Sequence, residues 1–177
     1  MTLEHLKDSI PDYAKDLKLN LGTVLQQSEL NEQQLWGTAL ACAIAAGSPS
    51  LLVAISTEAR AKLTPIAFAA AQSAAAIMGM NNVYYRFLHL IGDDKYRTIP
   101  ARLRMNAIRT HGVEHVDFEL WCLAVSAMNN CQACIASHEN VVRDKGLSTE
   151  AILAAVRIAS VLHAVASVVE AEKVSAG

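Results

Sequence analysis

The residues best suited to chemistry in this chain lie close together in its second half. Cys131 and Cys134 are three positions apart, and His138 follows four residues later. A carboxylate, Glu119, lies twelve residues before Cys131 in an otherwise apolar stretch. Two thiols at this spacing can close a disulfide or bind a metal ion, and a histidine and a glutamate nearby can move protons.

A single helix would present the thiols and the histidine together. Asn129 and Asn130 are expected to interrupt the upstream helix, and an asparagine is expected to be the N-cap of a new helix that begins at Cys131. Residues three and four positions apart share a helix face, so Cys134 and His138 would face the same way as Cys131. Both thiols would then lie in the first turn, where unpaired amides and the helix dipole favour a thiolate.

The rest of the chain predicts an all-α protein. Hydrophobic residues make up 53% of the 177 positions, with only 8 glycines and 4 prolines, and no segment alternates with period two. Helix starts are expected after Ser48, Thr64 and Ser148, because a capping hydroxyl there precedes a proline or an acidic first turn. Gly146 is placed where a helix would end.

The two halves of the sequence resemble each other. Trp36 and Trp121 each stand near the start of a helical run, 85 residues apart, and Thr64 and Ser148 open alanine-rich helices 84 residues apart. This pattern predicts a single domain over 1–177 with an internal duplication. Its pseudo-repeats would cover about 28–92 and 113–172, preceded by N-terminal helices over 1–27.

The duplication assigns the chemistry to one repeat. An offset of 85 puts Ala46, Pro49 and Val53 opposite the two thiols and the histidine. The first repeat therefore has no thiol at these positions. We expect it to be a scaffold, with the site in the second repeat.

Charge and hydropathy exclude several classes of protein. The net charge is −2 without a basic block, so nucleic-acid binding is not expected. The apolar stretch 151–169 is long enough to cross a membrane, but it contains Arg157 and His163 and is interpreted as a buried helix. The acidic, amphipathic N-terminus does not resemble an export signal, so a cytoplasmic location is predicted.

Zinc binding is the main alternative to redox chemistry. A zinc site could use Cys131, Cys134 and His138 as ligands in an interaction module, with Glu119 or His115 as the fourth. Structural zinc sites usually combine two separated ligand pairs, and the sequence contains only one close pair of cysteines. A redox pair is therefore the favoured interpretation, and zinc stays open.

The other cysteines and histidines are assigned no catalytic role. Cys42 and Cys122 lie in apolar helical runs, where a cysteine usually behaves as a small buried hydrophobe. His111 and His115 lie in or near a predicted turn. None of these four is expected to take part in the reaction.

The pattern Glu119-x11-Cys131-x2-Cys134-x3-His138 is similar to the active-site pattern of the AhpD alkylhydroperoxidases, within the carboxymuconolactone decarboxylase-like group. The resemblance extends over nearly the whole chain. It includes the segments 11–16, 33–38, 76–86 and 103–106. It implies an all-helical fold with a duplicated helical unit, assembly as a homotrimer, and thiol-dependent reduction of alkyl hydroperoxides.

The resemblance also assigns roles to the site residues. Cys134 would be the peroxidatic thiol that becomes a sulfenic acid, Cys131 would close the disulfide with it, and Glu119 and His138 would form a proton relay. No bound cofactor is implied. The partner would be the peroxiredoxin AhpC, with electrons arriving from the dihydrolipoyl group of a lipoyl-bearing protein and from dihydrolipoamide dehydrogenase, or from another dithiol donor.

One position departs from the family pattern. Relatives carry a histidine immediately before the second cysteine, where this sequence has Ala133. The neutral residue removes a cation that would favour the thiolate, so slower peroxide turnover is expected, with disulfide exchange retained. A decarboxylase-like activity on the same fold is a further alternative, and it would not need the two thiols.

Overall fold

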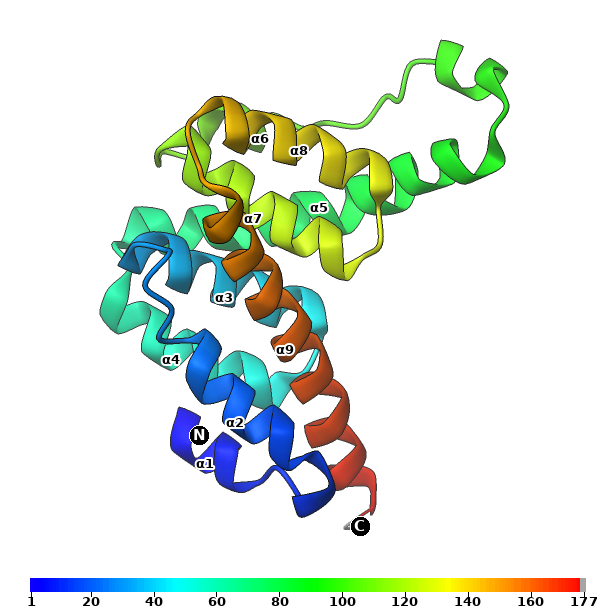
Figure 1. The fold of residues 1–177 in the computed structure, drawn as a ribbon. Coiled ribbons are helices and arrows are strands. Elements are labelled where there is room, and N and C mark those ends of the chain that lie inside the picture. The colour runs from blue at the N-terminus through cyan, green and yellow to red at the C-terminus, as the bar shows by residue number, and fades with distance from the viewer. Residues whose placement is uncertain (176–177) are drawn as a thin grey trace.

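The computed structural model describes residues 1–175, which fold into helices joined by short turns (Figure 1). No strand occurs within this range, which confirms the predicted all-α class. The α-helices are α1 (Leu3–Asp8), α2 (Lys15–Val24), α3 (Glu32–Ala46), α4 (Pro49–Lys62), α5 (Pro65–Ile91), α6 (Ala107–Thr110), α7 (His115–Met128), α8 (Gln132–Asp144) and α9 (Thr149–Ser175). The 3-10 helices are η1 (Asp12–Ala14) and η2 (Asp94–Thr98).

Local chemistry sets the helix ends that the sequence predicts. The hydroxyl oxygens of Ser48 and Thr64 accept hydrogen bonds from backbone amides in the first turns of α4 and α5, and a proline follows each. Ser148 does the same at the start of α9. Gly146 follows α8 with φ +91°, the left-handed conformation that suits glycine after a helix.

The two halves of the chain contain matching sets of helices. The helices α3, α4 and α5 have 15, 14 and 27 residues, and α7, α8 and α9 have 14, 13 and 27. The central pair α3 and α7 pack against each other, and each also packs against both α5 and α9. This correspondence supports the internal duplication, which stays a prediction.

The helix ends align the two halves with a different offset from the 85 residues that separate the two tryptophans. At the α3–α4 junction, Gly47 is left-handed (φ +71°) and Ser48 is the N-cap of α4. At the α7–α8 junction, Asn130 is left-handed (φ +53°) and Cys131 is the N-cap of α8. Both pairs are 83 residues apart, so Ser48 rather than Ala46 corresponds to Cys131.

The halves meet most closely where α3 crosses α7. Trp121 is fully buried there, and its ring packs against the backbone of Gly37. A methyl group at Gly37 would overlap the indole ring, so a glycine is required for this approach. The packing fixes α7, and therefore Glu119, relative to the first half.

The last helix, α9, lies among α2, α3, α4 and α7. It is long and apolar enough to cross a membrane by length and composition, and half of its most apolar 18-residue window is buried. The core helix of a soluble protein has the same properties. Its packing agrees with the sequence-based interpretation of a buried helix.

The end of α5 and the segment 92–106 project from the rest of the protein (Figure 1). Phe87 on α5 and Tyr96 in η2 pack edge to face within this arm, with ring centroids 5.6 Å apart. Several large apolar side chains on the arm are exposed, namely Val83, Phe87, Leu90, Ile91, Tyr96 and Ile99.

Candidate active site

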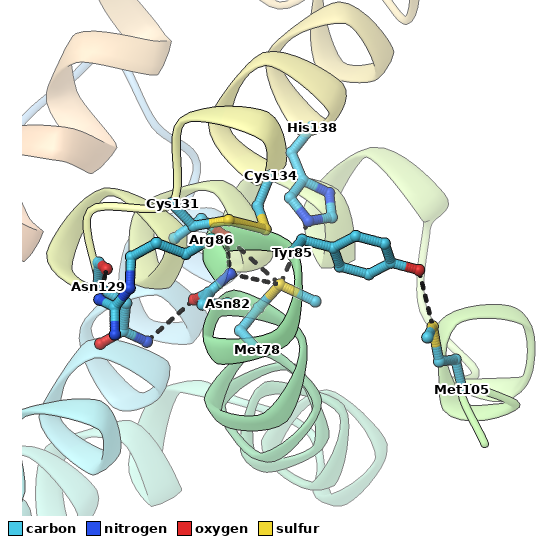
Figure 2. The surroundings of a disulfide bond; sticks show 10 residues. Met78, Asn82, Tyr85, Arg86, Met105, Asn129, Cys131, Cys134 and His138 are labelled. Atoms are coloured by element: carbon cyan, nitrogen blue, oxygen red, sulfur yellow. Dashed lines mark hydrogen bonds between the residues drawn. A yellow bond between two sulfur atoms is a disulfide. The ribbon is translucent and has the colours of Figure 1, made fainter. Parts of the chain in front are cut away.

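Cys131 and Cys134 are joined by a disulfide, with their Cα atoms 5.3 Å apart (Figure 2). Cys131 is the N-cap of α8 and has an extended backbone, while Asn129 caps the end of α7. The expectation of an asparagine N-cap with Cys131 inside the helix is therefore wrong by one residue. Asn130 instead forms the left-handed link between the helices, a conformation that asparagine tolerates better than most residues.

This placement leaves the start of α8 open. Cys131 makes no side-chain capping hydrogen bond to the first turn. The amides at the beginning of a helix carry partial positive charge, and no side-chain oxygen of the N-cap residue offsets it here. When the disulfide is reduced, this end of α8 favours a thiolate.

The two sulfur-bearing residues differ in access. Cys131 is fully buried, whereas Cys134 is 6% exposed and lines a cavity of about 240 Å³. The other residues that line this cavity are Asn81, Tyr85, Met105, Ile108, Ala133, Ser137 and His138. A small molecule can therefore reach Cys134 from the cavity, beside His138.

A buried carboxylate holds the histidine. The Nδ1 atom of His138 lies 2.6 Å from Oε2 of Glu119, and both residues are buried. Glu119 comes from α7 and His138 from α8, which pack against each other. The structure thus brings together all four residues that the sequence singled out, with His138 between Glu119 and the cavity at Cys134.

A methionine from α5 contacts the other side of the histidine ring. The Sδ atom of Met78 lies 3.3 Å from Nε2 of His138 and 3.4 Å from Oγ of Ser126 (Figure 2). Met78 is almost completely buried. The ring of His138 is therefore held on both nitrogens, by Glu119 and by Met78.

Three further side chains hold the turn before Cys131. Arg86 donates a 2.6 Å hydrogen bond to the carbonyl oxygen of Asn129. The side-chain amide of Asn129 donates to Oδ1 of Asn82, whose own amide donates to Ser126, both at 2.9 Å. Arg86 and Asn82 belong to α5, so this helix positions the junction at which the disulfide begins. Their role was not predicted from the sequence, although both lie in the segment 76–86 of the family resemblance.

A second histidine approaches the carboxylate. The Nε2 atom of His115 lies 3.6 Å from Oε1 of Glu119, and its ring stacks against that of His111. Partial burial and the neighbouring His115 lower the pKa of His111. No catalytic role was expected for His115, and its contact with Glu119 was not predicted from the sequence. The spacing of His115 and Glu119, four residues apart on α7, was the signal that could have revealed it.

Comparison with known proteins identifies the family. The model of the carboxymuconolactone decarboxylase family matches residues 95–176. Proteins named alkyl hydroperoxide reductase AhpD are similar over nearly the full length. The one from Solibacter usitatus is 58% identical over 172 residues, 97% of each chain, and the one from Streptomyces griseus is 57% identical over 176 residues, 99% of each. The chain belongs to the AhpD family.

Membership of the AhpD family confirms the resemblance drawn from the sequence. A third relative, from Rhodospirillum centenum, is 55% identical over 177 residues, which is all of this chain and 95% of the relative. Since these matches extend from end to end, the family assignment covers α1 and α2 as well as the site.

Zinc binding at this AhpD-family site would require the reduced form of the thiol pair, because Cys131 and Cys134 are bonded to each other. In the part of the chain that the structure describes, no three His, Cys, Asp or Glu side chains are grouped as metal ligands.

The two remaining cysteines are buried and free, as the sequence predicts. Burial raises the pKa of both the Cys42 and the Cys122 thiol, and the charge of Glu119 adds to the effect at Cys122. Both thiols are therefore protonated and unreactive at neutral pH.

Proposed function

We propose that this protein is an alkyl hydroperoxide reductase in which Cys131 and Cys134 cycle between a dithiol and a disulfide. The observation that carries the proposal is the position of this disulfide. One of its sulfurs faces a cavity that it shares with a histidine held by a buried carboxylate. The names of the AhpD relatives support the same activity.

The oxidative half of the cycle follows from this arrangement. The Cys134 thiolate attacks the terminal oxygen of the hydroperoxide, and the O–O bond breaks to give a sulfenic acid and an alkoxide. The alkoxide takes a proton from the pair formed by His138 and Glu119 and leaves as an alcohol. Cys131 then gives its proton to this pair, its thiolate attacks the Cys134 sulfur, and the displaced hydroxide takes the same proton and leaves as water.

The reductive half needs a dithiol. A thiolate of the donor attacks the Cys134 sulfur, and Cys131 leaves as a thiolate and takes up a proton. The second thiol of the donor loses its proton and attacks the donor sulfur of this mixed disulfide, so that Cys134 leaves as a thiolate and the donor disulfide closes. We assign this role to the dihydrolipoyl group of a lipoyl-bearing protein that dihydrolipoamide dehydrogenase keeps reduced. By the same exchange, the reduced protein would reduce the disulfide of a partner peroxiredoxin, AhpC.

The protein is also proposed to be a cytoplasmic homotrimer. The exposed apolar side chains of the arm formed by the end of α5 and the segment 92–106 support assembly, because such a patch on a soluble protein usually contacts another surface. Sedimentation equilibrium should give three times the chain mass of 19.0 kDa. A monomer at micromolar concentration would contradict the trimer and leave the chemistry untouched.

Intact-mass spectrometry tests the chemistry directly. The reduced protein is treated with one equivalent of tert-butyl hydroperoxide, and we expect the loss of two hydrogens, confined to the peptide that contains Cys131 and Cys134. Cys131→Ser should stop at the sulfenic acid and gain one oxygen, while Cys134→Ser should not react. An unreactive dithiol in the native protein would refute the peroxidase proposal.

The family-model match keeps a decarboxylase-like enzyme as the second candidate. That chemistry does not need the sulfurs, so it predicts an activity that survives in a variant with both Cys131→Ser and Cys134→Ser. The peroxidase proposal predicts that the same double variant is inactive. Metal analysis of the protein as purified, combined with thiol titration, tests the zinc alternative separately.

Ala133 provides a test of rate. Ala133 lies on the cavity next to Cys134, so a histidine at this position would place a cation near the thiolate. Ala133→His is expected to speed peroxide turnover and to leave disulfide exchange with a small dithiol unchanged. Stopped-flow measurement of both rates decides this, and an unchanged turnover would contradict the prediction.

A further inference from the structure

Two adjacent, buried asparagines on α5 differ in whether their side chains are hydrogen-bonded. Asn81 and Asn82 are both buried, at 5% and 1% exposure. The side-chain amide of Asn82 donates to Ser126 and its oxygen accepts from Asn129. The side-chain oxygen of Asn81 is buried without a hydrogen-bond partner among the residues that the structure describes. Buried polar groups are usually paired, so Asn81 requires an explanation.

Asn81 lines the cavity that contains Cys134 and His138. Tyr85, Met105 and Ile108 supply most of the remaining wall, and the Tyr85 hydroxyl contacts the Met105 sulfur, 4.0 Å away. Ala133 and Ser137, which also line the cavity, are solvent-exposed. Asn81 is therefore a buried polar residue that lines this cavity together with the apolar side chains of Met105 and Ile108 and the ring of Tyr85.

The size of the cavity limits its occupant. An apolar cavity of about 150 Å³ is enough to hold benzene, so a volume of about 240 Å³ has room for a small organic molecule. Its apolar part would lie against Tyr85, Met105 and Ile108. A small alkyl hydroperoxide meets both conditions.

We propose that Asn81 binds the hydroperoxide group of the substrate and orients it toward the sulfur of Cys134. The inference rests on the proposed peroxidase function and deepens it. A carboxamide carries one acceptor and two donors, and rotation of its last bond exchanges the end that faces the cavity. Its oxygen accepts the O–H of the hydroperoxide, which gives this buried atom its missing partner.

The chemistry of the two substrates makes this residue selective. The O–H of a hydroperoxide is a good hydrogen-bond donor, whereas the S–H of a dihydrolipoyl group is a weak one. Both substrates react at Cys134, so a residue that acted on the sulfur itself would affect both half-reactions. Asn81 affects mainly the oxidative half.

The test compares the two half-reactions in Asn81→Ala and Asn81→Leu. Reduced protein is mixed with tert-butyl hydroperoxide, and disulfide protein is mixed with dihydrolipoamide, each by rapid quench with mass detection. We expect the second-order rate constant with hydroperoxide to fall about tenfold or more, as expected for one lost hydrogen bond to a reacting group. The rate constant with dihydrolipoamide should change less than about threefold. The test needs only one of the two variants to fold.

Thermal stability separates binding from a structural role. Removing an unpaired buried polar group should not lower Tm, so Asn81→Ala is expected to unfold at or above the native temperature. The matched control, Asn82→Ala, breaks three side-chain hydrogen bonds, to Met78, Ser126 and Asn129, and should lower Tm and slow both half-reactions.

Three outcomes are decisive. An unchanged hydroperoxide rate in a folded Asn81 variant overturns the inference, and so does an equal fall in both half-reactions. A native protein that does not react with hydroperoxide overturns the proposed function itself. The native control therefore distinguishes the two failures.

Discussion

The junctions α3–α4 and α7–α8 have the same backbone plan and different chemistry. Each has a left-handed residue followed by an N-cap, Gly47 and Ser48 in the first half and Asn130 and Cys131 in the second. Ser48 accepts a hydrogen bond from the amide of Leu51. Cys131 makes no such bond and is joined to a second sulfur. A serine oxygen caps the helix in one half, and a cysteine that forms a disulfide with Cys134 takes the same place in the other.

The residues that follow each junction extend this difference. Leu51 and Ile55 are fully buried on α4, and the cap register places them opposite Cys134 and His138 on α8. The first half has two apolar core residues where the second has a sulfur and a base beside a cavity. Corresponding helix positions therefore hold core residues in one half and the residues proposed to react in the other.

The largest expected difference concerns two carboxylates. Glu119 on α7 accepts from His138 on α8, and Glu170 on α9 accepts from Ser48 at the start of α4. Glu119→Gln should lower kcat for hydroperoxide roughly a hundredfold to ten-thousandfold, the range for loss of a general acid–base group. Glu170→Gln should leave kcat unchanged and lower Tm only. Steady-state kinetics on both variants measures this, and similar kcat losses would show that the carboxylate beside His138 has no special role in the reaction.

The next largest effect is expected on stability, at the contact between Gly37 and Trp121. Gly37→Ala drives a methyl group into the Trp121 ring and is expected to cost about 1–3 kcal/mol of unfolding free energy, as for other overpacked cores. Gly79→Ala is the matched control, because a methyl group added there would meet no other atom within 4 Å, and alanine favours a helix by up to about 1 kcal/mol. Urea denaturation of both variants should therefore give shifts of opposite sign. A neutral Gly37→Ala would show that the α3–α7 crossing can relax.

A smaller effect is expected at the cap. Ser48→Ala removes the side-chain cap of α4 and should cost about 1 kcal/mol of unfolding free energy. Peroxide turnover should be unaffected, because neither Ser48 nor its partner Glu170 lines the cavity at Cys134. Urea denaturation and a turnover assay on one preparation provide both numbers. A fall in turnover without a fall in stability would contradict the comparison.

The smallest expected effect is the pH dependence of the stability that the Ser48 side chain contributes. The hydrogen bond from Ser48, followed by Lys173, holds the pKa of Glu170 below its usual value. A carboxyl with a lowered folded-state pKa stabilises the fold above its unfolded pKa, and this contribution is lost as pH falls through the folded pKa. The stability difference between native protein and Ser48→Ala should therefore narrow as pH falls below about 4.5, the usual value for glutamate. Denaturation curves at pH 6 and in acid provide the test, and a constant difference would contradict it.

The sequence predicted those features that depend on neighbouring residues. The starts of α4, α5 and α9 are set by hydroxyl caps at Ser48, Thr64 and Ser148, which act within one turn. The common face of Cys134 and His138 likewise follows from spacing on one helix, and both line the cavity. The register at Cys131 was missed because asparagine serves both as an N-cap and as a left-handed link, and two asparagines in a row leave the choice open.

The contribution of α5 could not be read from the sequence. Met78, Asn81 and Asn82 reach the site from more than forty residues away, on a helix whose many alanines give little sign of which side meets α7 and α8. Which of the two asparagines is paired depends on where Ser126 and Asn129 lie in space. Only tertiary packing determines this.

The unequal exposure of the two sulfurs determines which of them another molecule can reach first. Cys131 is fully buried, so we expect a partner disulfide to be attacked by the Cys134 thiolate, and Cys131 to resolve the mixed disulfide that forms. A variant with Cys131→Ser would keep the attacking thiol and lose the resolving thiol. When Cys134 of this variant attacks the disulfide of a partner peroxiredoxin, one partner sulfur leaves as a thiolate and the mixed disulfide should persist, so that the partner can be identified by its mass.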